Sequence, residues 1–518
     1  MGIRKRRKGS EKYMQTLNDI KLKIGQSEEE LVRIATKKLG RKPNYFKILK
    51  KSLDARDKQN IRFVYSVAFS DIDETEVRTF EKLDRPPRVV VVGSGPAGLF
   101  CALRLIDYGV RPIVLERGKC VAERIKSNQT FFKEHILDAE SNIQFGEGGA
   151  GTFSDGKLYT QTNNPQNKNN ADVFSTFIRF GAPEEIGYLA KPHIGSDRLR
   201  EVVVRMREYI RENGGEVRFS SKMTGINVRE GKAVSVIVND REELFCDDIV
   251  LAIGHSARDT FQYLSDLLLM EQKEFAVGVR IEHLQEEIGR AQYGAAYSCL
   301  PPAEYKVVSH AAGRGCVSFC MCPGGYVIPA ASEEGTVVTN GMSNYARDGV
   351  NANSALVVQV KKQDFGGDDV LAGVRFQRDL ERKAFMFGGG DYRAPVQLVG
   401  DFLRGRVSDA FCNVRPTYEA GTRFAPLDEV LPAFVAESLR AALPDMGRRL
   451  KGFDDPSAVM TGVESRTSSP IRILRDETLQ SSVKGIYPCG EGCGYSGGIT
   501  SSAADGLRVA DAIAQKYR

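Results

Sequence analysis

Residues 89–99 read VVVVGSGPAGL, in which four valines lead directly into glycines 93, 95 and 98 with the spacing G-x-G-x-x-G. An uninterrupted apolar run of this kind is typical of a parallel strand that is buried on both faces. Residues 99–108 then have the pattern of a helix, and a second strand over 112–115 ends at Glu116. This strand–turn–helix–strand order predicts a dinucleotide-binding unit.

Each residue of the motif has a physical task in such a unit. Gly93 allows the tight turn, Gly95 lets a pyrophosphate approach the backbone, and Gly98 lets the helix and strand pack closely. The free N–H groups and the positive dipole end of the helix favour the phosphates. We expect Glu116 to accept hydrogen bonds from the ribose hydroxyls of an adenosine.

The same spacing recurs over 146–151 and 492–497, so the pattern alone is weak and its context must decide. No apolar strand precedes the second match, which we expect to let the backbone lie against a flat ligand. The third match lies between a strand at 485–488 and a helix at 502–517. It therefore aims a second helix N-terminus at an electron-rich group.

Three segments, 93–116, 249–254 and 486–491, together resemble the FAD-binding segments of glutathione-reductase-type flavoproteins. The resemblance implies non-covalent FAD. A second complete unit for NAD(P)H is missing, so either a nicotinamide binds transiently as electron donor or the substrate itself delivers the hydride. The residues predicted to bind the cofactor are Gly93, Gly95, Pro96, Ala97, Gly98, Glu116, Arg117, Gly148, Gly149, Gly151, Thr152, Met223, Ile253, Gly254, Gly490, Glu491, Gly497, Gly498 and Ile499.

Finer motifs resemble the uncharacterised FAD-dependent dehydrogenase family within that class. They lie at 145–158, 254–260, 318–325 and 466–470, and the resemblance runs from about residue 16 to the C-terminus. It does not supply a substrate. Cys493 stands where a small residue such as Ala is expected, which would put a thiol near the flavin.

The expected fold class is α/β, with a Rossmann-like FAD-binding domain of the glutathione-reductase type, an inserted β-rich substrate domain and a small N-terminal α+β domain. The ranges are 1–84 for the small basic domain and linker, 85–274 and 461–518 for the two parts of the FAD-binding domain, and 275–460 for the inserted cap. The small domain is expected to have the order β-α-β-β.

The composition points to an intracellular enzyme. Ten cysteines in 518 residues, with no C-x-x-C spacing, are too sparse for a disulfide scaffold and favour reduced thiols over metal ligands, so no metal site is predicted. No window has the ~20 consecutive apolar residues that a membrane span needs. We expect a cytoplasmic protein without a membrane partner; the oligomeric state is left open.

Positive charge is concentrated at the start of the chain. Residues 1–51 hold 16 Lys and Arg against 5 Asp and Glu, although the whole chain has a net charge of only +6. This asymmetry leaves two interpretations open, an anionic partner such as nucleic acid or a solvated tail and helix face, and the second is favoured.

His255, Arg466 and Tyr495 are the candidate catalytic residues. His255 is a proton donor or acceptor or an orienting group, and Arg466 binds a substrate carboxylate, stabilises reduced flavin or makes a structural ion pair. A polar cluster (Asn340, Ser343, Arg347, Asn351 and Asn353) reads a polar substrate or forms a hydrogen-bonded loop network, and the network is favoured. A dithiol relay between Cys320 and Cys322 is disfavoured, since the two are expected to face opposite sides of a strand.

The leading functional prediction is an FAD-dependent oxidoreductase, a dehydrogenase or reductase, that acts on a small organic molecule. Two alternatives are kept. The first is a flavin-dependent RNA modification enzyme that binds RNA through the basic leading segment. The second is a non-catalytic scaffold that retains FAD as a structural core.

Overall fold

The computed structural model describes residues 14–70, 79–158 and 169–518, and the mixed α/β class is confirmed. The basic stretch 4–8 and the polar stretch 161–168 lie outside the described residues. The described residues form a five-stranded sheet, a seven-stranded sheet, two three-stranded sheets and two short strand pairs.

A parallel sheet forms the centre of the chain, in the strand order β22-β10-β4-β5-β6. Its central strand β4 is the run of four valines, all of them buried, as expected for a strand covered on both faces. The five strands are β4 (Val89–Val92), β5 (Ile113–Leu115), β6 (Glu216–Arg218), β10 (Asp248–Leu251) and β22 (Ile486–Pro488).

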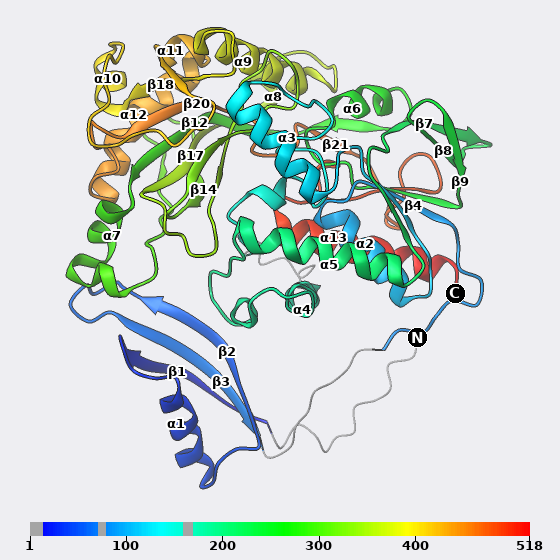
Figure 1. Cartoon of the computed structure of the whole chain (residues 1–518), viewed down its shortest axis with the longest axis horizontal. Coiled ribbons are helices and arrows are strands. Elements are labelled where there is room, and N and C mark those ends of the chain that lie inside the picture. Colours follow the sequence, from blue (N-terminus) through cyan, green and yellow to red (C-terminus); the bar gives the residue numbers. More distant parts are fainter. Residues whose placement is uncertain (1–13, 71–78, 159–168) are drawn as a thin grey trace.

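Three helices pack together against this sheet: α2 (Pro96–Asp107), α5 (Ser196–Glu212) and α13 (Ile499–Lys516) (Figure 1). Gly506 of α13 lies so close to α2 that a Cβ atom there would be 2.1 Å from the Ala97 carbonyl oxygen. Because β4, β10 and β22 run parallel, the loops that follow them meet at one edge of the sheet, where ligands of such folds bind.

Two further sheets are connected to the central one. An antiparallel sheet consists of β7 (Met223–Arg229), β8 (Lys232–Val238) and β9 (Glu242–Phe245) and shares a hydrophobic core with β10. The seven-stranded cap sheet has the order β13-β14-β17-β12-β20-β18-β19. Its strands are β12 (Phe275–Leu284), β13 (Val308–Ser309), β14 (Cys316–Cys322), β17 (Asn351–Val360), β18 (Ala394–Leu398), β19 (Thr422–Phe424) and β20 (Val459–Glu464).

Helices α9 (Ala372–Gly388) and α12 (Ala433–Arg449) contribute to the core of the cap. Strand β20 pairs with β12 and β18 and continues to Glu464, so the cap sheet extends beyond residue 460. The remaining elements are α3 (Val121–Glu134), α4 (Asn170–Arg179), α6 (Arg258–Ser265), α7 (Gln285–Tyr293), α8 (Lys362–Phe365), α10 (Val399–Arg404), α11 (Leu427–Val430), β11 (Met270–Gln272), β15 (Tyr326–Pro329), β16 (Thr339–Met342) and β21 (Ile471–Ile473).

The expected β-α-β-β order of the N-terminal unit is confirmed. It consists of β1 (Gln15–Lys23), α1 (Glu29–Leu39), β2 (Tyr45–Asp54) and β3 (Arg62–Ser70), with β3 in the middle of the sheet. Gly40 ends α1 with φ +80°, a left-handed conformation that glycine adopts without strain. Lys51 of β2 exchanges backbone hydrogen bonds with Tyr188 and Ala190, at 2.8 and 2.9 Å, so the unit is attached to the main body.

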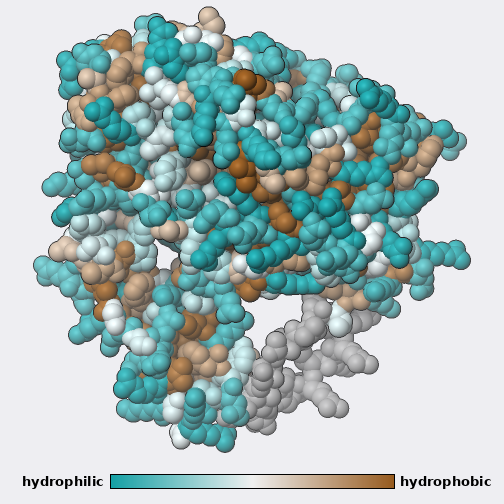
Figure 2. Space-filling view, in the orientation of Figure 1, coloured by the Kyte–Doolittle hydropathy of each residue, from teal (hydrophilic) through white to brown (hydrophobic). Residues whose placement is uncertain are grey.

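The surface in Figure 2 is mostly hydrophilic, with hydrophobic residues in small separate groups. Within the described ranges, none of the helices combines the length and apolar character required to traverse a membrane.

Candidate functional site

A single cavity of about 860 Å³ reaches from the glycine loops of the parallel sheet to the cap sheet. A volume in the range of roughly 300–1,000 Å³ is usual for ligand and cofactor sites. The walls come from the ends of β4, β10 and β22, from the first turns of α2 and α13, and from β14 and β20 of the cap. The cavity therefore connects the predicted dinucleotide site with the inserted domain.

The first glycine loop has the geometry that its sequence predicted. Gly93 has φ +105°, and a Cβ there would lie 2.2 Å from the Ala252 carbonyl oxygen. A Cβ at Gly98 would lie 1.9 Å from the carbonyl oxygen of Gly93, so this glycine serves packing and does not line the cavity. Gly95 caps α2 and faces the cavity with Pro96 and Ala97.

Glu116 lies at the end of β5, with its carboxylate held by backbone groups. Oε2 accepts hydrogen bonds from the backbone N–H and hydroxyl of Ser94, at 3.0 and 2.6 Å. Oε1 accepts from the backbone N–H groups of Gly118 and Gly146, at 2.9 and 3.0 Å. Glu116 thus joins the first and second glycine loops and still lines the cavity, where ribose binding stays a prediction.

Arg117 belongs to a charged network beside Glu116. Its guanidinium donates to Glu140 and Asp259, with distances between 2.7 and 3.0 Å, and lies over the Phe145 ring. Lys222 approaches the same two carboxylates. Arg117 lines the cavity, as does Met223, which follows Lys222 in the chain.

The second glycine loop is supported from behind by a residue that the sequence analysis missed. The buried Arg124 guanidinium donates to four backbone carbonyls between Asn142 and Gly149, at 2.7 to 2.9 Å. Gly149 and Gly151 line the cavity, whereas Gly148 and Thr152 lie behind them. A lone arginine on a helix carries no sequence signal for this role.

The third glycine loop joins β22 to α13. Glu491, Gly497, Gly498 and Ile499 line the cavity, and the N-terminus of α13 opens into it. Gly490 does not line it; its N–H donates to Asp505 Oδ2 at 2.9 Å. Asp505, which was not predicted, is in turn paired with Arg475 at 2.7 Å.

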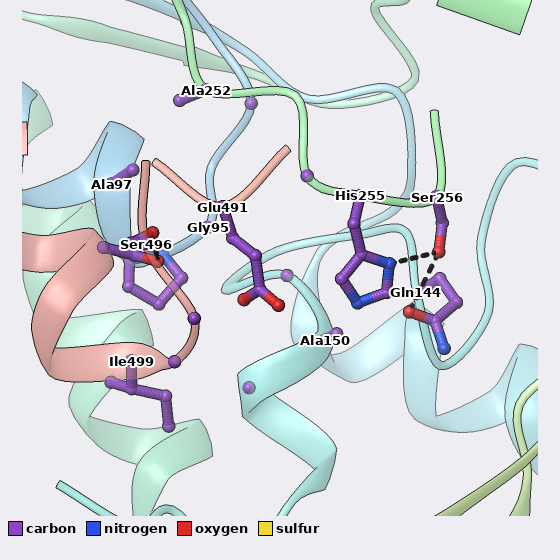
Figure 3. Close-up of a pocket in the computed structure, with 18 of the residues that line it drawn as sticks. Gly95, Ala97, Gln144, Ala150, Ala252, His255, Ser256, Glu491, Ser496 and Ile499 are labelled. Atoms are coloured by element: carbon purple, nitrogen blue, oxygen red, sulfur yellow. Dashed lines mark hydrogen bonds between the residues drawn. The ribbon is translucent and has the colours of Figure 1, made fainter. Parts of the chain in front are cut away.

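Ile253, Gly254 and His255 follow β10 along the wall of the cavity, and Figure 3 shows the His255 ring extending into it. His255 Nδ1 lies 3.0 Å from the Ser256 hydroxyl, which donates to Gln144 Oε1 at 3.2 Å. Burial, together with the nearby Arg466 and Arg258, lowers the pKa of His255 to about 4. The imidazole is therefore neutral near pH 7.

Arg466 lines the cavity, but its guanidinium is already engaged. Nε and Nη2 donate to the two carboxylate oxygens of Glu381, at 3.0 and 2.8 Å, and Nη1 donates to Ser332 Oγ at 2.5 Å. Arg258 binds the same carboxylate at 2.8 and 2.7 Å. Of the roles considered from the sequence, this geometry favours the structural ion pair.

Tyr495 also lines the cavity, with its hydroxyl directed elsewhere. The hydroxyl donates to the Ile473 carbonyl oxygen at 2.9 Å, and the Arg475 guanidinium lies 3.6 Å from the ring centroid. Burial raises the pKa of Tyr495. Because its proton is committed to the backbone, the geometry favours a supporting role over proton transfer.

Glu491 differs from these engaged groups, because no hydrogen bond to its carboxylate is found among the described residues. The side chain extends into the cavity near His255 (Figure 3). Burial raises the pKa of Glu491 to about 7, against the opposing charge of Lys273. Lys273 lines the same wall, and burial lowers its pKa. The sequence predicted that Glu491 binds the cofactor. The structure adds that its carboxyl group has no hydrogen-bond partner among the described residues.

The polar cluster of the cap is mainly a hydrogen-bonded network, as favoured from the sequence. Arg347 is paired with Asp155 and Glu304, and Asn353 accepts a hydrogen bond from Arg280 at 3.2 Å. Among the members of that cluster that the structure describes, Asn340 is the one that lines the cavity.

Cys493 is fully buried, and its thiol donates to the Leu251 carbonyl oxygen at 3.1 Å. Burial raises the pKa of this thiol to about 12. Cys493 does not line the cavity, so its thiol is screened from whatever the cavity holds.

The residues present fit FAD. Two helix N-termini open into the cavity, which suits a pyrophosphate. A Cβ at Gly95 would lie 3.9 Å from the Cα of Gly149, so the first and second glycine loops contact each other and together line the cavity with backbone. Cβ atoms at Gly497 and Gly498 would meet no atom within 4 Å, so backbone is open to a ligand there as well.

Sequence comparisons identify the same regions. Residues 87–132 match an FAD binding domain, and residues 274–467 match the family described as FAD-dependent protein, C-terminal domain-like. Residues 14–70 match a domain of unknown function. A Clostridium beijerinckii protein described as uncharacterized is 45% identical over 526 residues, covering 95% of this chain and 98% of that protein.

Solved structures show only a distant likeness. The flavin-dependent brominase Bmp2 is 13% identical, with a TM-score of 0.38 over 84% of this chain and 80% of that chain. A glycerol-3-phosphate dehydrogenase from Bacillus halodurans complexed with FAD is 15% identical, with a TM-score of 0.37 over 84% of this chain and 65% of that chain. At these TM-scores neither likeness assigns a reaction. The two flavin-related matches and the full-length relative lead to one conclusion: the chain is an FAD-dependent flavoprotein and belongs to the same family as the Clostridium beijerinckii protein.

Proposed function

We propose that the chain is an FAD-dependent oxidoreductase of glutathione-reductase-type architecture that transfers hydride between flavin and an organic substrate. The observation that carries this proposal is the continuity of the cavity from the glycine loops to charged groups of the cap. The cap end is lined by Lys157, Tyr305, Asn340 and Glu464, which provide both signs of charge and hydrogen-bonding groups for a polar molecule.

FAD, when bound, supplies the two-electron chemistry, and the chain supplies binding, orientation and proton transfer. Glu491 is the group we assign to proton transfer. Its carboxyl is unpaired in the cavity, and a pKa of about 7 lets it hold or release a proton near neutral pH. Lys273 balances the carboxylate charge when the proton leaves.

His255 orients rather than ionises in this proposal. The Ser256 hydroxyl donates its proton to Gln144, so the 3.0 Å contact with Nδ1 requires that Nδ1–H donate to Ser256. Nε2 then carries a lone pair and accepts a hydrogen bond in the cavity. Arg466 acts through Glu381 as a positioning residue, since each of its guanidinium nitrogens already donates to the protein.

An anaerobic titration tests the proposal. The FAD-loaded protein is mixed first with NADH, then with NADPH, and then with polar organic donors, while the visible flavin band is followed. Bleaching by a pyridine nucleotide supports a reductase with a transient nicotinamide donor, and bleaching by an organic donor supports a dehydrogenase. Reduction by dithionite but by none of the donors contradicts both and supports the scaffold alternative.

A matched pair of variants makes the test specific. Glu491→Gln keeps the size of the side chain and removes the ionisable proton, so flavin reduction by the active donor should slow at least tenfold near pH 7. Glu437→Gln, at an exposed position of α12, should leave the rate unchanged. Equal rates in the two variants would contradict the role of Glu491.

Nucleic-acid binding by the N-terminal unit is kept as a second proposal, with a flavin-dependent RNA modification as the corresponding activity. Residues 14–70 contain 13 Lys and Arg against 6 Asp and Glu, and Lys37, Lys38 and Lys42 are exposed. Such a surface favours a polyanion.

A further inference from the structure

Cys320 and Cys322 lie at the end of β14, where the strand departs from regular pairing. Phe319 is opposite Ala355 of β17, and Cys322 is opposite Asn353. Three residues along β14 therefore span the same length as two residues along β17, which is a β-bulge. The expectation that the two cysteines face opposite sides was wrong. Residues two apart on a strand share a face, and the bulge brings these two still closer.

The two thiols interact directly in this bulge. The Cys322 thiol donates to the Cys320 carbonyl oxygen at 3.4 Å, and the two thiols lie close enough for each to shift the pKa of the other. Arg280 Nη1 donates to the same carbonyl oxygen at 2.9 Å and so fixes the bulge. Cys320 lines the cavity, whereas Cys322 is fully buried behind it. One thiol is therefore accessible to a reactant, and the other is placed to resolve a bond to it.

The electrostatic surroundings favour a thiolate at the accessible position. The hydrogen bond from Cys322, with the charges of Lys157 and Arg280, lowers the pKa of Cys320. The hydrogen bond to Cys320 and burial raise the pKa of Cys322. A thiolate beside a protonated thiol is the form in which a dithiol reacts.

The backbone at Cys320 is also strained. Its φ of +46° lies in the left-handed region, which residues with a Cβ rarely adopt. Strain of this kind collects at functional sites. Glycine would adopt this φ without strain, but position 320 carries a cysteine. The chain therefore keeps a thiol there at an energetic cost.

We propose that Cys320 and Cys322 form a redox-active dithiol, a second two-electron centre in the same cavity as the FAD. Oxidation forms the Sγ–Sγ bond, breaks the Cys322 S–H bond, and releases two electrons and one proton. FAD, when bound, would supply the acceptor for the electron pair and for one proton, and Glu464 would relay that proton from Cys322; reduction of the disulfide would reverse each step. This deepens the proposed function, because it adds a site at which a thiol or disulfide substrate exchanges with the chain.

Glu464 is suited to receive that proton. Its carboxylate pairs with Arg280 at 3.2 Å and lines the cavity near Cys320. Burial raises the pKa of Glu464 to about 7, so the group changes its protonation near neutral pH.

The test counts electrons. FAD-loaded protein is oxidised with diamide, freed of reagent and titrated anaerobically with dithionite, while flavin absorbance is followed. The wild type is expected to take up two electron pairs per FAD, and Cys320→Ser and Cys322→Ser one each. Cys412→Ser, at an exposed cysteine that does not line the cavity, is the matched control and should still take up two.

Mass spectrometry of the digested, diamide-treated protein gives a readout that does not depend on flavin. A linked 320–322 peptide, two hydrogens lighter than the reduced form, is expected. A single electron pair in the wild type, together with both thiols open to alkylation after oxidation, would overturn the proposal. This criterion rests on the wild type, so it holds even if a variant fails to fold. Because dithionite is the donor, the number of electron pairs taken up per FAD does not depend on whether an organic substrate reduces the flavin. Failure of this proposal can therefore be distinguished from failure of the proposed function.

Discussion

The two carboxylate oxygens of Glu381 accept hydrogen bonds from the Arg466 guanidinium at 3.0 and 2.8 Å, deep within the chain. Arg258 binds the same carboxylate from α6. Burial alone would raise the pKa of Glu381, but the two arginines outweigh it and lower that pKa. One carboxylate of the cap helix α9 therefore holds two arginines, one of which lies three residues after His255.

Replacing Glu381 by Gln should destabilise the chain strongly, since it removes the carboxylate that the buried Arg466 and Arg258 guanidinium groups share and leaves Arg258 with Glu333, at 3.1 Å, as its remaining ion-pair partner. Breaking a buried ion pair by removing one partner costs about 3–5 kcal/mol. Urea unfolding followed by circular dichroism measures the loss, with Glu437→Gln as the control. A loss below about 1 kcal/mol would show that the arginines find other partners and that Glu381 is not the centre of the network.

Gly98→Ala should weaken FAD binding, because its Cβ would lie 1.9 Å from the Gly93 carbonyl oxygen and would displace the turn between β4 and α2. We expect FAD to bind at least tenfold more weakly, measured by fluorescence titration of the apoprotein. Gly187→Ala is the control, since a Cβ there would meet only the end of Ile178 at 3.4 Å. If both variants bind FAD like the wild type, the first glycine loop is not the pyrophosphate site.

Glu491→Gln should change how stability depends on pH. Because the folded-state pKa of Glu491 is raised, its contribution is fully present below about pH 4.5 and is lost as the pH rises through about 7. The loss is at most about 3.5 kcal/mol, since the pKa rises from 4.5 to about 7 and one pKa unit corresponds to about 1.4 kcal/mol. The thermal unfolding temperature should therefore fall more steeply in the wild type than in Glu491→Gln as the pH rises from 4 to 8. Parallel curves would mean that Glu491 titrates as an ordinary exposed carboxylate.

Charge reversal on the N-terminal unit tests the nucleic-acid proposal in the full-length chain. The triple variant Lys37→Glu, Lys38→Glu and Lys42→Glu should bind single-stranded RNA at least tenfold more weakly than the wild type in a filter assay at 50 mM salt. Wild-type binding should weaken steeply between about 50 and 200 mM salt, because released counterions drive such binding. Equal binding by both proteins, or no salt dependence, would reject the RNA proposal.

The sequence alone determined the first glycine loop and its neighbours. Strand, turn and helix follow one another within residues 89–107, so each side chain acts on groups close to it in the chain. The apolar run, the glycine spacing and the helix pattern are local signals, and they also identified the N-terminal β-α-β-β unit. The resemblance to flavoproteins rests on three such local segments.

The tertiary structure decided which side chains of the cavity are free to act. Arg466 meets Glu381 across 85 residues, and Arg258 meets it across 123, and no periodicity encodes such distant pairings. The same holds for the unpaired Glu491 and for the bulge that joins Cys320 to Cys322, which depends on the register of β14 against β17. Local patterns specify elements and tight turns, because the forces there act between chain neighbours. Charge pairing and burial depend on residues that meet only when the chain has folded.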